Sequence, residues 1–179
     1  MYNVNKKSEF NETKNLNVTK KYSMNYNNEI QDGIKIKTIT LERIFVDKLF
    51  AAESYFRKSN DPHKAFEAAK HIYDLTILEK HNAIIALFEN DNLLEYLLKV
   101  RLKEEKDRHD GIPGVLPKEF EFFTKIHLDK NIFEAYLIMQ KQYVLRDEYK
   151  IDFYDAINSL VRIKEKLQLN PSWFNAILD

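Results

Sequence analysis

The stretch TITLERIFVDKLFAAESYF, residues 38–56, decides the fold class. Its apolar side chains recur every three or four residues, which is the spacing of one face of an α-helix. Thr40 is a favourable N-cap for this helix, which we expect to run to about Arg57. Glu42 and Asp47 would lie toward the positive end of the helix dipole. Such a helix must bury its apolar face against other elements.

One position on this apolar face is charged. Lys48 falls at helical spacing among apolar residues, namely Leu41, Phe45, Leu49, Ala52 and Phe56. A lone buried ammonium group is costly, so the Lys48 side chain either extends its head to water or finds an acidic partner.

A second helical stretch, AAKHIYDLTIL at residues 68–78, offers that partner. Asp74 sits there among apolar neighbours, much as Lys48 does. Asp61 and Pro62 open this helix, which we expect to reach about Glu79. In an antiparallel pair of helices, Lys48 would face Asp74. The two would form either a structural ion pair or a site, in which the ammonium binds phosphate oxygens and the carboxylate orients it or accepts a proton.

The rest of the chain also reads as helical, apart from its beginning. Residues 81–108 predict one or two helices, and HDGIPGVLP at residues 109–117 predicts a loop. Three more helices and a last turn follow, over residues 117–126, 131–145 and 152–167 and from Pro171 onward.

The first 32 residues are a polar, Asn-rich arm. IKIKTI, residues 34–39, alternates apolar and polar side chains and predicts a short strand, whose partner must lie in residues 1–32 or in another chain. We therefore expect a mainly α-helical bundle with a short N-terminal β segment, in which residues 33–179 form one helical domain.

Composition excludes several kinds of site. The 28 basic residues balance 28 acidic ones, so no global field steers the chain to nucleic acid or to a membrane. Three glycines are too few for a Gly-rich phosphate loop. The absence of cysteine excludes a thiolate zinc site, and the five histidines have no metal-binding spacing. No apolar run reaches the roughly 20 residues that a membrane span needs. We expect a cytoplasmic protein.

Two stretches in order, ITLERIFVDKLFA at residues 39–51 and KHIYDLTIL at residues 70–78, resemble motifs of the AbiEii/AbiGii-type nucleotidyltransferase toxins. Members carry a segment like sLERtFvdKlfA and then a helix like RHlYDlykl. The aromatic-rich EAYLIMQKQYVL and the final LVRIKEKL also fit the order of the family's later helices. The resemblance covers about residues 33–179.

The resemblance implies a fold similar to DNA-polymerase-β-like nucleotidyltransferases, with an N-terminal α/β catalytic part and a C-terminal helical part. It implies a toxin of a type IV toxin–antitoxin system, involved in phage abortive infection, that transfers a nucleotide to an RNA or protein acceptor. Mg²⁺ and a nucleoside triphosphate would be its cofactors, and an antitoxin and tRNA its partners.

The resemblance also assigns expected roles to five residues. Lys48 matches the lysine expected to contact nucleotide phosphates, and Asp74 matches an aspartate that supports the active site. Lys70, His71 and Tyr73 match motif positions expected at the nucleotide. Glu42 matches a position of the first motif whose role the resemblance does not define. Lys70 stands where many members have arginine, which keeps the charge but loses the two-pronged hydrogen-bonding geometry.

One family element is absent from this sequence. The family's first motif is a Gly-Ser turn followed by Asp-x-Asp, which hold the triphosphate and magnesium. The chain has neither, and the nearest candidates are NDN at residues 90–92 and DFYD at residues 152–155. The first lacks paired carboxylates, and the second has the wrong spacing. We therefore expect a truncated or split enzyme that depends on a missing N-terminal half.

Other interpretations stay open. A non-catalytic helical module would bind RNA or a protein partner. Arg57 and His63 have a spacing found in helical ribonucleases, although a proline-containing break separates them. One set of aromatic residues sits at helical spacing and forms either core or a stacking platform for bases: Phe120, Phe122, Phe123, Phe133, Tyr136, Tyr143, Phe153, Tyr154, Trp173 and Phe174.

Overall fold

The computed structural model describes residues 13–17 and 35–171, and the chain divides into two units, residues 1–40 and 41–179. In the first unit, strand β1 (Thr13–Asn17) pairs antiparallel with β2 (Lys35–Ile39), so that Thr13 is opposite Ile39 and Asn17 opposite Lys35. The strand expected at residues 34–39 is therefore confirmed, and its partner comes from the first 32 residues. The rest of that arm lies outside the described residues.

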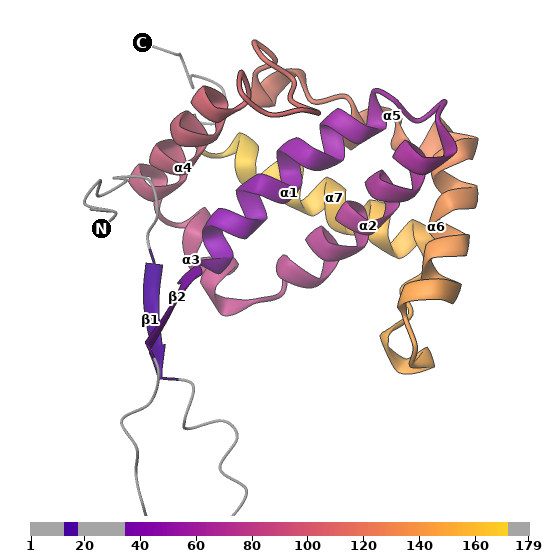
Figure 1. The fold of residues 1–179 in the computed structure, drawn as a ribbon, viewed down its shortest axis with the longest axis horizontal. Coiled ribbons are helices and arrows are strands. Elements are labelled where there is room, and N and C mark those ends of the chain that lie inside the picture. Colours follow the sequence, from indigo (N-terminus) through magenta and orange to yellow (C-terminus); the bar gives the residue numbers. More distant parts are fainter. Residues whose placement is uncertain (1–12, 18–34, 172–179) are drawn as a thin grey trace, which may run out of the picture. The chain divides into compact units, whose positions relative to one another are not determined.

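The second unit is built on an antiparallel pair of helices, α1 (Leu41–Phe56) and α2 (Pro62–Leu78) (Figure 1). Asp61 is the N-cap of α2, since its carboxylate accepts a hydrogen bond of 2.8 Å from the backbone N–H of His63. Pro62 occupies the first turn, where its missing N–H costs nothing. Both helices match the predicted bounds to within a residue.

Five further helices complete this unit in the described residues. They are α3 (Asn82–Phe88), α4 (Asp91–Glu104), α5 (Phe122–Lys125), α6 (Lys130–Tyr143) and α7 (Phe153–Gln168). Short 3₁₀ turns lie at η2 (Pro117–Glu119), η3 (Ile126–Leu128) and η4 (Asp147–Tyr149). None of the described helices is long and apolar enough to cross a membrane. The last turn expected after Pro171 falls on residues 172–179, outside the described residues.

The single helix expected over residues 117–126 is wrong. Phe120 takes an extended conformation with ψ of 115°, which ends η2 and separates it from the single turn of α5. The backbone N–H of Phe122 donates to the buried carboxylate of Glu53 at 3.0 Å. A side chain of α1 thus satisfies a backbone donor that a continuous helix would have bonded to its own carbonyls.

The core lies where α1 and α2 pack against α6, α7 and the shorter helices (Figure 1). Phe45, Leu49 and Ala52 of α1 are fully buried, as the apolar stripe predicted. The aromatic set divides. Phe120, Phe122, Phe123, Tyr136 and Phe153 are core residues, whereas Phe133, Tyr143 and Tyr154 are exposed, so neither the core nor the exposed platform accounts for the whole set. Trp173 and Phe174 lie outside the described residues.

Candidate functional site

Lys48 and Asp74 meet between the two long helices. Because α1 and α2 are antiparallel, the middle of α1 lies beside the last turns of α2, and Lys48 Nζ is 2.6 Å from Asp74 Oδ2. The two side chains keep 28% and 39% of their surface exposed. The lysine is therefore neither buried alone nor free in water, because its ammonium is paired with a carboxylate and both side chains are partly exposed.

This ion pair lies in a cleft of about 570 Å³. One wall comes from α1 and α2, and its lining residues are Lys48, Glu67, Lys70, His71, Tyr73 and Asp74. The other wall comes from the end of α6 and the residues after it, and is lined by Met139, Tyr143, Val144, Leu145, Arg146 and Tyr149. A smaller hollow of about 410 Å³ adjoins it and shares Lys48, Tyr73, Asp74 and Tyr149.

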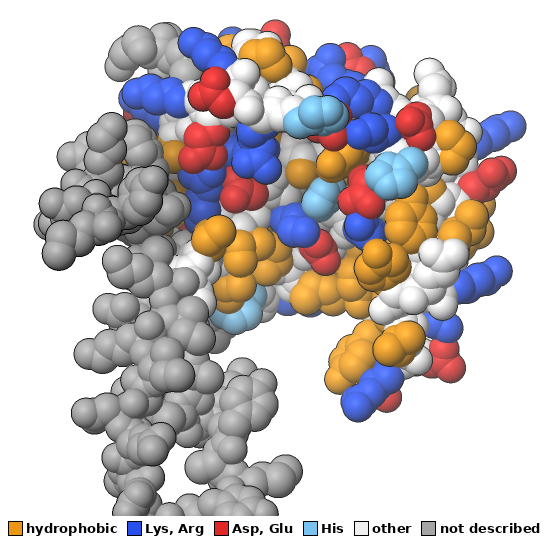
Figure 2. Space-filling view, in the orientation of Figure 1, with side chains coloured by type: hydrophobic (Ala, Val, Ile, Leu, Met, Phe, Trp, Pro, Cys, Tyr) orange, Lys and Arg blue, Asp and Glu red, His pale blue; other side chains and the backbone are white. Residues whose placement is uncertain are grey.

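The two walls differ in character. The wall from α1 and α2 holds two lysines, two carboxylates and a histidine, whereas the wall after α6 is largely aromatic and aliphatic. Figure 2 shows charged and histidine side chains mixed over α1 and α2, with hydrophobic side chains gathered toward the end of α6. All five residues singled out from the sequence, Lys48, Lys70, His71, Tyr73 and Asp74, line the charged wall. Glu42, in the first turn of α1, does not line the cleft.

Lys70 is held at the border between the two walls. Its Nζ lies 2.7 Å from Glu67 Oε1 and 5.3 Å from the centre of the Tyr143 ring. Burial acts to lower the pKa of Lys70, but the hydrogen bond and the charge of Glu67 outweigh it and raise this pKa. Lys70 therefore keeps its positive charge at neutral pH.

Tyr73 joins the two walls. Its hydroxyl donates a hydrogen bond of 3.0 Å to the backbone carbonyl of Tyr149. Burial, and then the negative charge of Asp74, raise the pKa of Tyr73 above its ordinary value. The phenol thus remains a hydrogen-bond donor at neutral pH, and it fixes the segment after α6 to helix α2.

His71 is neutral in this setting. Its ring stacks on that of Tyr55, with centroids 5.5 Å apart and planes inclined by 20°. Burial, and then the positive charge of Lys48, lower the pKa of His71 to about 4. Its Nδ1 is buried and has no hydrogen-bond partner among the described residues. His71 therefore contributes shape and a polar nitrogen to the charged wall, and no charge at neutral pH.

Replacing His71 by glutamine should flatten the pH dependence of stability below pH 6.5. The pKa of about 4 in the folded chain lies below the ordinary value of 6.5, so the unfolded chain binds more protons between these values. Stability is then lost as the pH falls through this window, by up to about 3 kcal/mol at pH 4. Denaturant unfolding of wild type and His71→Gln at pH 7 and pH 4 measures the difference.

A matched control for this experiment is His127→Gln, which replaces an exposed histidine outside the cleft. It should keep the wild-type change in unfolding free energy between the two pH values. An equal loss of stability in wild type and His71→Gln would contradict the neutral, buried state of His71.

Sequence reasoning missed the second wall. The sequence assigns Tyr143 to a set of aromatic residues that forms either core or a stacking platform, and it does not single out Leu145, Arg146 or Tyr149. Their signal in the sequence is weak: three large apolar side chains fall within the seven residues 143–149, next to charged ones. Glu67 carries no pattern of its own beyond its spacing of three residues from Lys70.

The Arg57–His63 combination does not belong to this cleft. Arg57 Nε donates to Glu53 Oε1 at 2.6 Å, and its Nη2 donates to the backbone carbonyl of Glu119 at 3.2 Å. Arg57 therefore joins the end of α1 to the segment before α5. His63 is exposed in the first turn of α2.

The residues described do not fit a magnesium site. Within residues 13–17 and 35–171, no three His, Asp or Glu side chains come together as metal ligands. The two carboxylates of the cleft, Glu67 and Asp74, each pair with a lysine. In the NDN and DFYD stretches, Asn90 and Asp152 are N-caps of α4 and α7.

Comparison with known proteins identifies a family. The family described as nucleotidyl transferase AbiEii toxin, type IV TA system, matches residues 9–159, a range that includes every residue of the cleft. No curated protein and no solved structure matches the chain.

Proposed function

Since the chain belongs to the family of nucleotidyl transferase AbiEii toxins of type IV toxin–antitoxin systems, we propose that its cleft binds the nucleoside triphosphate of a nucleotidyl transfer reaction. Lys48 contacts phosphate oxygens, and Asp74 is the positioning residue that holds the ammonium in place. The observation that carries this proposal is the 2.6 Å Lys48–Asp74 pair on the charged wall of an open cleft.

The state of this ion pair supports a binding role over a purely structural one. Half-exposed ion pairs contribute about 0–1 kcal/mol to stability, so Lys48 and Asp74 do little to hold α1 and α2 together. The same geometry leaves the ammonium accessible from the cleft and already oriented by the carboxylate. Lys70, held by Glu67 on the same wall, supplies a second cation for a polyanionic ligand.

The reaction sets what the cleft must do. In nucleotidyl transfer an acceptor hydroxyl gives its proton to a base or to water, and its oxygen attacks the α-phosphorus. The bond from the α-phosphorus to the bridging oxygen breaks, and pyrophosphate leaves with that electron pair. Lys48 and Lys70 would bind and orient the phosphates, and the neutral His71 would add no charge to the cleft. Because the described residues do not fit magnesium, we propose that the carboxylates for this metal come from a separate N-terminal catalytic half.

The finer parts of the proposal concern partners. We take the acceptor to be RNA or protein, with tRNA as the first to test. An antitoxin would oppose the activity, and abortive infection by phage would be its biological setting. Nucleoside triphosphates and tRNA are both found in the cytoplasm, and the proposal places the protein there.

Transfer of label tests this function. The chain is co-expressed with the reading frames that flank its gene, and the purified material is incubated with α-labelled nucleoside triphosphates, Mg²⁺ and total tRNA. We expect wild type to transfer the label. Asp74→Asn should reduce the rate of transfer about tenfold to hundredfold, the usual range for losing one charge-assisted hydrogen bond. The matched control is Asp61→Asn, which removes a carboxylate from the same helix and keeps the N-cap.

The alternative function is that of a helical module that binds RNA or a protein without catalysis. Absence of both label transfer and nucleotide binding, with the helical fold intact by circular dichroism, would favour that module. Transfer that is equal in wild type and Asp74→Asn would contradict the role given to the ion pair.

A further inference from the structure

The residues 143–149, here called the aromatic segment, expose large side chains that the fold leaves uncovered. Tyr143, Leu145 and Tyr149 are 61%, 91% and 54% exposed. Removing such apolar surface from water is favourable, so a ligand that covered this group would gain affinity from it. All three side chains line the cleft, on the wall that faces Lys48 and Asp74.

Contacts on both sides hold the aromatic segment in place. Tyr149 is fixed through its backbone, whose carbonyl accepts from the Tyr73 hydroxyl at 3.0 Å. The Tyr143 ring lies 5.7 Å from the Phe66 ring and 5.3 Å from Lys70 Nζ. The segment is therefore fastened to α2 at two points, which position the Tyr143 ring and the Tyr149 backbone before any ligand arrives.

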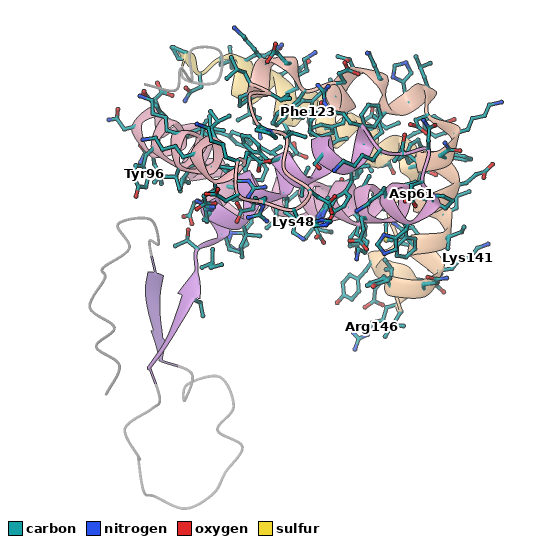
Figure 3. All side chains as sticks on the ribbon, turned by 45° about the horizontal axis from the view of Figure 1, so that its top comes forward. Lys48, Asp61, Tyr96, Phe123, Lys141 and Arg146 are labelled. Carbon is teal, nitrogen blue, oxygen red and sulfur yellow. The ribbon has the colours of Figure 1, made fainter. Side chains whose placement is uncertain are left out.

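A cation lies beside each of the two tyrosine rings. Lys70 lies beside Tyr143, and the Arg146 guanidinium carbon lies 6.0 Å from the centre of the Tyr149 ring. Arg146 projects from the segment at the edge of the fold (Figure 3). An aromatic surface bordered by cations suits a ligand that is planar at one end and anionic at the other.

We propose that the aromatic segment is the nucleobase subsite of the cleft. The phosphates lie on Lys48 and Lys70, and the base stacks on Tyr143 or Tyr149, with Leu145 beside it. This inference rests on the proposed function and adds to it the orientation of the nucleotide. A nucleotide joins a planar base to a polyanion, and the two walls offer a surface for each. Stacking on an aromatic side chain is a common source of affinity for bases.

The test compares ligands with and without a base. Each of the four nucleoside triphosphates, and inorganic tripolyphosphate, is titrated into the full chain by calorimetry, and the tightest nucleotide is kept as probe. Removing the ring on which the base stacks, in Tyr149→Ala or in Tyr143→Ala, should weaken nucleotide binding by about fivefold to hundredfold and leave tripolyphosphate binding unchanged. Tyr149→Phe should bind the nucleotide as wild type does, because stacking needs only the ring.

The matched control is Tyr154→Ala, which removes an equally exposed tyrosine of α7 that does not line the cleft. It should change neither affinity. Circular dichroism of each variant establishes that the helices are formed before any affinity is compared.

Two results would overturn the subsite and leave the proposed function standing. One is nucleotide binding that depends on Lys48 but is equal in wild type and both tyrosine-to-alanine variants. The other is a nucleotide that binds no more tightly than tripolyphosphate, since the base then contributes nothing. Binding of neither ligand to the folded wild-type chain would overturn the proposed function and the subsite together, and would point to a protein that covers the aromatic segment.

Discussion

Replacing Lys48 by methionine should weaken nucleoside triphosphate binding by about tenfold to hundredfold. Methionine keeps an unbranched apolar stem on the α1 face and removes only the ammonium group. A charge-assisted hydrogen bond is worth about 1.5–3 kcal/mol, and 1.4 kcal/mol corresponds to a tenfold change in affinity. Because Asp74 then stays in the cleft without its partner, its repulsion of the phosphates adds to the loss. Calorimetric titration of the variant measures the effect.

The matched control is Lys64→Met. Lys64 is also a lysine of the α1–α2 pair, and its Nζ lies 2.9 Å from Asp110 Oδ2, outside the cleft. Asp110 retains Lys58, whose Nζ lies 3.0 Å from Oδ1, so this variant leaves no carboxylate unpaired. It should bind nucleotide as wild type does. Equal affinities in Lys48→Met and Lys64→Met would show that Lys48 is a structural residue.

Replacing Arg101 by methionine should lower the free energy of unfolding by about 3–5 kcal/mol, the usual cost of breaking a buried ion pair. Arg101 Nη2 lies 2.6 Å from Glu105 Oε1, and the two side chains are 3% and 1% exposed. Burial lowers the pKa of Arg101, while the charges of Glu105 and Asp47 oppose this. Removing the guanidinium leaves the carboxylate of Glu105 buried without its cation. Denaturant unfolding measures the loss.

Glu105 also holds a loop in place, so losing its ion pair affects more than α4. Its Oε2 accepts from the backbone N–H of Ile112 at 2.7 Å, so the Arg101–Glu105 pair also anchors the loop of residues 109–117. The control is Lys99→Met on the same helix, where Lys99 pairs with Glu95 at 2.9 Å at the exposed surface. That change should cost at most about 1 kcal/mol. Equal losses in the two variants would contradict a buried pair.

Local patterns predicted the two long helices and their shared ion pair. The apolar stripe of α1 and the Asp61–Pro62 start of α2 are encoded within a few residues, as caps and periodicity are. The short connection between them forced an antiparallel pair, and that geometry brought Lys48 to Asp74. The charged wall of the cleft could therefore be predicted from the sequence.

The aromatic wall of the cleft could not be predicted from the sequence. The spacing of Tyr143 continues the apolar face of α6, which predicts burial, but exposure depends on whether another element covers that face. Among the described residues, contacts cover only part of these side chains, and Tyr143 and Tyr149 stay 61% and 54% exposed. The break before α5 was missed for a related reason: the carboxylate that accepts from Phe122 belongs to Glu53, 69 residues earlier. Long-range contacts of this kind leave no local pattern.

Hydrogen–deuterium exchange of the full chain, with and without saturating nucleoside triphosphate, tests most directly whether the cleft binds a nucleotide. The account predicts slower exchange in peptides that cover residues 66–76 and 140–150, which carry the two walls, and unchanged exchange in residues 82–104 of α3 and α4. Exchange that is unchanged throughout the chain, or slowed only outside the two walls, would contradict it.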